Sequence, residues 1–145
     1  MKNKVTTGFL VLFVAVIIAN IGVQYAEAAG NYTDTKYLIE YAGDGCDLAT
    51  ATRLKMDATS SYAKNQSTHC NHRIWVAGTH SHKNNTPLSF NDCSCNSGGY
   101  IVPIGEYRYL PNLVYERGYE YAFLVIRPES HQPCIVEGLW SPDSI

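Results

Sequence analysis

The feature that most constrains this chain is a series of short β-like segments separated by turn residues. Four such segments lie in the C-terminal third, at residues 101–110, 113–116, 120–126 and 134–139, and Pro, Gly and Asn stand between them. Regular turn spacing of this kind is typical of an antiparallel sandwich or barrel. No segment with a helical period and caps follows residue 28, so the sequence predicts an all-β fold.

Further strands are predicted earlier in the chain. Residues 35–41 are rich in β-formers and end at a Gly-Asp-Gly turn, and residues 73–77 form a second apolar run. Residues 50–56 alternate with the period of a half-buried strand, with a short helix as the alternative. Residues 57–66 are small and polar and are expected to be a loop, and residues 80–99 are the longest irregular region.

The N-terminus has the pattern of a secretory signal peptide. Lys2 and Lys4 precede an apolar run at residues 9–19, and Ala26-Glu27-Ala28 supplies small residues for a peptidase. A membrane anchor is the alternative, but this run reaches only about half of the ~20 residues that a spanning helix needs. We expect a signal peptide at residues 1–28 and a single β-rich secreted domain at residues 29–145, with no membrane span after cleavage.

Five cysteines lie in the expected mature chain, where export favours disulfides. The sequence predicts a small domain stapled by bridges between Cys46, Cys70, Cys93, Cys95 and Cys134. Our preferred pairing joins Cys46 to Cys70 and one of Cys93 or Cys95 to Cys134. Because the count is odd, the remaining thiol would lie beside the loop at residues 96–99, where it could form a covalent dimer.

Net charge and short sequence motifs limit which partners and modifications the chain can have. Eleven basic and thirteen acidic side chains give a formal net charge of -2, so no basic excess is present to bind nucleic acid. N-glycosylation triplets begin at Asn31, Asn65 and Asn84, and they have meaning only if the source cell is eukaryotic. No Gly-rich phosphate loop or other cofactor motif is present, so no cofactor is expected.

A histidine cluster is the main candidate for chemistry. His69, His72, His80 and His82 could meet across a hairpin and hold zinc or copper. The alternative is that they are solvated loop residues, because no metal-binding spacing motif accompanies them. The same imidazoles with Lys83 could act as an acid and base on a phosphodiester, but no basic patch would hold that substrate.

Tyrosine is the other unusual feature, because six of the eleven lie between residues 100 and 121. Tyr107 and Tyr109 share a strand face, as do Tyr119 and Tyr121, and such rings suit recognition of carbohydrate or protein. The alternative is cross-strand packing on half-buried sheet faces.

These observations together favour a secreted, extracellular, non-enzymatic protein that binds an extracellular protein or a carbohydrate, or that assembles into extracellular matrix. Two other classes stay open. One is a secreted metal-binding protein that uses the histidine cluster, and the other is a secreted toxin or defence protein.

Overall fold

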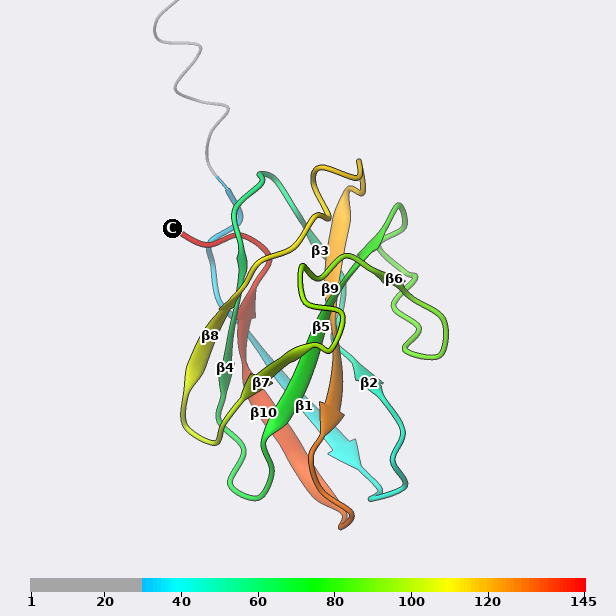
Figure 1. The fold of residues 1–145 in the computed structure, drawn as a ribbon, viewed down its shortest axis with the longest axis vertical. Helices are drawn as coiled ribbons and strands as arrows, with labels where there is room; N and C mark the ends of the chain where they lie inside the picture. The colour runs from blue at the N-terminus through cyan, green and yellow to red at the C-terminus, as the bar shows by residue number, and fades with distance from the viewer. Residues whose placement is uncertain (1–29) are drawn as a thin grey trace, which may run out of the picture.

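The computed structural model describes residues 30–145, and these residues form two antiparallel sheets without a helix. Figure 1 shows the two sheets as layers that lie face to face. The predicted all-β class is confirmed, and of the two expected architectures the chain adopts two packed sheets. The expected signal peptide, residues 1–28, lies outside the described residues. No helix of residues 30–145 has the length and apolar character that a membrane span requires.

The first sheet has four strands in the order β1-β10-β4-β8. Strand β1 (Thr35–Tyr41) pairs with β10 (Cys134–Ser141) over its whole length, and β10 pairs with β4 (Ser61–Asn65). Strand β8 (Tyr107–Leu110) pairs with β4 and ends the sheet. One edge of β8 is therefore open.

The second sheet has six strands around a long central pair. Strand β5 (His72–Thr79) pairs with β9 (Tyr121–Pro128) along all eight residues. Four short strands extend this pair: β2 (Leu48–Ala49), β3 (Arg53–Leu54), β6 (Asn91–Asp92) and β7 (Tyr100–Val102). Strands β2 and β3 pair with β9, whereas β6 and β7 pair with β5.

The core lies between the sheets. Ile74 and Leu124 point inward from the six-stranded sheet and are fully buried, and Val136 and Trp140 meet them from the four-stranded sheet. This alternation of buried positions is what the period of a strand requires. Burial of these side chains is the main favourable term that holds the layers together.

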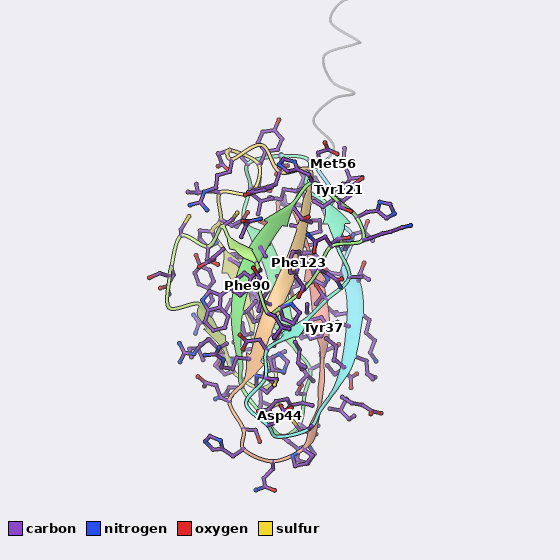
Figure 2. All side chains as sticks on the ribbon, turned by 90° about the vertical axis from the view of Figure 1, so that its right-hand side faces the viewer. Tyr37, Asp44, Met56, Phe90, Tyr121 and Phe123 are labelled. Carbon is purple, nitrogen blue, oxygen red and sulfur yellow. The ribbon has the colours of Figure 1, made fainter. Side chains whose placement is uncertain are left out.

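The outer faces of the two sheets differ in how far other segments cover them. The outer face of the six-stranded sheet is covered in part by the irregular segment 80–99, whose Phe90 packs against the buried Phe123 (Figure 2). No segment of residues 30–145 covers the outer face of the four-stranded sheet in this way, and Leu38 and Ile135 on it are exposed. The four-stranded sheet is therefore the one that presents side chains to solvent.

A buried ion pair ties the two ends of the described chain together. Asp143 Oδ1 lies 2.7 Å from Lys55 Nζ, and both side chains are fully buried. Asp143 Oδ2 accepts hydrogen bonds from the backbone N–H groups of Asn31 and Met56, at 2.6 and 3.1 Å. One carboxylate thus holds three segments that are distant in sequence.

Three predictions about strands are wrong. Residues 57–66 were expected to form a loop but contain β4. The inward residues of β4 are small or polar, so the sequence shows no apolar pattern there. Residues 50–56 contain only the two-residue strand β3, because the chain turns there to bury Lys55. Residues 113–116 form a turn in which Val114 alone is buried, so the apolar run there marks a single core contact.

Candidate functional site: a tyrosine cluster on the open sheet

Three tyrosines gather on the outer face of the four-stranded sheet. Tyr62 comes from β4, and Tyr107 and Tyr109 come from β8, which lies beside β4 in Figure 1. The register places Tyr62 directly opposite Tyr109, so that the three side chains point to the same side. We call Tyr62, Tyr107 and Tyr109 the tyrosine cluster.

The rings of the tyrosine cluster form a corner. The ring centroid of Tyr62 lies 5.7 Å from that of Tyr107, with 33° between the planes, and 5.9 Å from that of Tyr109. Tyr109 stands nearly perpendicular to Tyr107, at 81° and 6.0 Å. Two rings therefore offer a tilted floor and the third offers a wall.

The cluster is open to solvent. The exposed fractions of Tyr107 and Tyr109 are 57% and 53%, whereas Tyr62, beside them on β4, is half-buried. A shallow depression of about 630 Å³ runs along β8 at residues 105–109, and a smaller one of about 160 Å³ separates the cluster from the C-terminal residues. Exposed aromatic rings beside open depressions are accessible to a ligand.

A charged side chain and the tyrosine hydroxyls lie beside the rings. Lys64 lies opposite Tyr107 on β4 and shares the face of the rings, whereas Arg108 lies opposite the buried Ala63 and alternates to the other face of β8. Burial, aided by the nearby Asp34 carboxylate, raises the pKa of Tyr62, so its hydroxyl stays protonated near neutral pH. The site thus combines flat apolar faces with hydrogen-bonding groups at their rim.

The other two tyrosines expected on a binding surface lie elsewhere. Tyr121 is the first residue of β9 in the six-stranded sheet, Tyr119 lies two residues before it, and both are half-buried. Tyr119 covers Gly78, where an added Cβ would lie 2.4 Å from its ring, and it also stacks with His80 at 4.9 Å. The structure therefore brings Tyr107 and Tyr109 together with Tyr62 and separates them from Tyr119 and Tyr121.

Sequence reasoning missed Tyr62, because residues 57–66 were expected to be a loop. The alternation of Ser61, Ala63 and Asn65 with the larger Tyr62 and Lys64 is the signal that could have identified this strand. The buried positions of β4 are occupied by small or polar side chains, so a search for apolar periodicity does not find it.

The four histidines considered for a metal site occupy different surroundings. His72 is buried, with Tyr37 Oη 3.1 Å from its Nδ1 and Ser67 Oγ 2.8 Å from its Nε2. His69, His80 and His82 are exposed, and His82 lies near Tyr121. Within residues 30–145, no three His, Cys, Asp or Glu side chains are grouped so that they could hold a metal ion.

The three glycosylation acceptors also differ. Asn65 is fully buried, and its amide donates to the carbonyls of Cys70 and Val102, so a glycan at Asn65 is incompatible with this fold. Asn31 is half-buried and donates to Leu54 O. Only Asn84 among the three is exposed.

The structure contains five free thiols. Cys46 and Cys95 are exposed, and Cys93 is buried. Cys70, which was expected to pair with Cys46, instead lies against Cys134, with 3.2 Å between the sulfur atoms. Cys134 was expected to pair with Cys93 or Cys95.

The comparison with known proteins gives one match. The protein family described as "Protein of unknown function (DUF2712)" matches residues 24–144. No curated protein and no solved structure matches the chain. A proposal for its function therefore depends on the surface of the fold itself.

Proposed function

The chain belongs to the DUF2712 family, and we propose that it is an exported, disulfide-stapled, non-enzymatic protein that binds carbohydrate through its tyrosine cluster. The single observation that carries this proposal is the corner formed by Tyr62, Tyr107 and Tyr109 on the uncovered face of the four-stranded sheet. The N-terminal pattern of Lys residues, apolar run and small residues supports the export step.

The chemistry of the corner fits a sugar. A tyrosine offers a rigid apolar face and a polar hydroxyl at low entropic cost, and a sugar ring offers C–H groups on its face and hydroxyls at its edge. The floor formed by Tyr62 and Tyr107 would take the sugar face, and the ring of Tyr109 would contact its side. Lys64, which lies opposite Tyr107 on the same face, and the tyrosine hydroxyls would hydrogen-bond to the hydroxyl groups of the sugar.

The size of the cluster favours a sugar over a folded protein partner. A stable protein interface buries about 800 Å² on each partner, which requires a broad patch of some 20–30 residues a side. The tyrosine cluster comprises three rings on two strands, with Lys64 beside them on the same face. A short glycan could be bound by this area, because it needs only a few stacked rings and hydrogen bonds.

The proposal is tested by binding to defined polysaccharides. Full-length protein recovered after secretion would be incubated with insoluble chitin, cellulose and peptidoglycan, and bound against free protein would be measured over a concentration series. Replacing two exposed aromatic anchors typically costs about 2 kcal/mol or more, so Tyr107→Ser/Tyr109→Ser should weaken binding about thirtyfold.

The matched control is Tyr115→Ser. Tyr115 is also exposed, at 49%, but it lies in the turn after β8 and not in the tyrosine cluster. We expect it to bind as the unchanged protein does. If the unchanged protein binds none of the three polysaccharides, or if the double variant binds as tightly as the control, the carbohydrate proposal is refuted.

A further inference from the structure

We infer that Cys70 and Cys134 form a disulfide that joins the two sheets, and that Cys134 is the thiol that first reacts with the oxidant. Cys134 is the first residue of β10 in the four-stranded sheet, and Cys70 lies two residues before β5 of the six-stranded sheet. The inference rests on the export step of the proposed function, because an exported chain reaches a compartment whose oxidant can form the disulfide.

The two thiols are held in place by the backbone around them. Their sulfur atoms are 3.2 Å apart, so a bond needs a closer approach of only about 1 Å. The carbonyl of Cys70 accepts a hydrogen bond from Asn65 Nδ2 at 3.0 Å, and Cys134 is paired with Tyr41 of β1. The next residue, Asn71, accepts from the backbone N–H of Glu129, which lies in the turn before β10.

The surroundings of the two sulfur atoms give the order of reaction. Cys134 is half-buried and lines an open groove of about 740 Å³, together with Thr68, His69 and Pro133. Cys70 has an exposed fraction of 2%, and burial, together with its contact to Cys134, raises its pKa to about 12. An oxidant in the groove therefore meets Cys134 first.

The reaction is a pair of thiol–disulfide exchanges with a disulfide oxidant. The Cys134 thiolate attacks one sulfur of the oxidant, which releases one thiolate and forms a mixed disulfide. Cys70 then gives up its proton and attacks the Cys134 sulfur, and the second half of the oxidant leaves as a thiol. The protein loses two protons and two electrons, which reduce the oxidant disulfide to two thiols.

The other cysteines have different neighbours. Cys93 Sγ contacts the carbonyl of Asn91 at 3.5 Å and Arg117 Nη1 at 3.7 Å. Cys46 and Cys95 are exposed. The inference therefore predicts one internal disulfide, one buried thiol and two accessible thiols.

The bond would lock a loop that also carries a buried polar network. Cys70 lies in the connection between β4 and β5, in which Ser67 Oγ lies 2.8 Å from His72 Nε2. The cross-link spans a sequence separation of 64 residues, so it restricts the unfolded chain strongly. We expect reduction to lower the melting temperature by roughly 10–15 °C.

Peptide mapping tests the pairing directly. Full-length protein that has been secreted is alkylated without reduction and digested with trypsin, which cleaves after Lys and Arg. Cys70 then falls in residues 65–73, Cys134 in residues 118–145, Cys46 in residues 37–53, and Cys93 with Cys95 in residues 84–108. We expect residues 65–73 joined to residues 118–145. Any other partner for Cys70, or no cross-link, overturns the pairing.

The order of reaction is tested with oxidised glutathione on reduced, folded protein. Cys70→Ala should accumulate a glutathione adduct on Cys134, because the second thiol is missing, whereas Cys134→Ala should leave Cys70 unmodified. Cys95→Ala is the matched control and should form the Cys70–Cys134 bond as the unchanged protein does. An adduct on Cys70 in Cys134→Ala, or none on Cys134 in Cys70→Ala, refutes the order. If Cys70→Ala does not fold, the early time course of the unchanged protein is read for the same Cys134 adduct.

These results are independent of carbohydrate binding. If peptide mapping finds the Cys70–Cys134 bond but the protein binds none of the polysaccharides, only the carbohydrate proposal is refuted. Closure with glutathione but no cross-link in secreted protein would show that the exporting compartment does not supply the oxidant, which contradicts the inference for the protein in its cell.

Discussion

Replacing Asp143 by Asn removes one charge from the buried pair that joins the two ends of the described chain. The amide keeps the shape of the carboxylate, but it cannot neutralise Lys55 Nζ, which lies 2.7 Å from Asp143 Oδ1 in a fully buried position. The next carboxylate, that of Asp57, is 3.8 Å from Lys55 Nζ and partly exposed. The variant therefore leaves a buried ammonium without its main partner.

The expected cost follows from the depth of the pair. Removing one partner of a buried ion pair costs about 3–5 kcal/mol, because the remaining charge is left uncompensated. A change of 1 kcal/mol shifts the melting temperature of a domain of this size by roughly 4 °C, so the variant should melt about 12–20 °C lower. The exposed pair of Lys36 and Glu137, also at 2.7 Å, is the internal comparison, and Lys36→Met should cost less than about 1 kcal/mol.

A double-mutant cycle isolates the pair from its surroundings. Urea unfolding would be measured for Asp143→Asn, Lys55→Met and the combination of the two. Lys55→Met should cost less than Asp143→Asn, because Asp143 keeps the backbone N–H groups of Asn31 and Met56. The double variant should be more stable than Asp143→Asn alone, since no unpaired ammonium remains. A loss below about 1 kcal/mol for Asp143→Asn, or strictly additive effects, would refute this account.

Two further predictions concern buried positions of the sheets. Burial lowers the pKa of His72 to about 4, so the unfolded chain binds a proton more readily than the folded one. Stability present above about pH 6.5 should fall by about 3 kcal/mol as the pH drops to about 4, and His72→Gln should remove this slope in urea titrations at each pH. An added Cβ at Gly138 would lie 2.2 Å from Lys64 O and 2.3 Å from Tyr37 Oη. Gly138→Ala should therefore lower the free energy of unfolding by about 3 kcal/mol. A variant that is as stable as the unchanged protein in thermal melts would contradict this close packing.

The long strands could be predicted from the sequence because their own residues specify them. Strands β1, β5, β9 and β10 carry the β-branched and aromatic residues that suit a pleated sheet, and each was expected within a few residues of its observed bounds. Tyr107 and Tyr109 were expected on one face because residues two apart in a strand point the same way. Local pattern was sufficient for these features.

The remaining features depend on contacts that are distant in sequence. Strand β4 is a strand because β10 and β8 lie on its two sides, and its buried Ser61 and Asn65 are satisfied by hydrogen bonds and not by apolar packing. The sequence around Lys55 indicates a solvent-facing residue, and only the fold shows that it is buried beside Asp143. The proximity of Cys70 to Cys134 likewise follows from how the two sheets meet, which spacing alone does not reveal.

Because Asn31 contacts Asp143, the two ends of the described chain could be joined and the chain opened elsewhere, so the same fold could be formed by a circularly permuted sequence. Both ends of the described chain meet at one end of the molecule, close to the C-terminus marked in Figure 1. A short linker from residue 145 to residue 30 would turn the chain into a ring, and the exposed segment at residues 81–84 offers a place to cut it. Such a circular permutant would leave the ten strands of residues 30–145 intact and would place its new termini outside the tyrosine cluster.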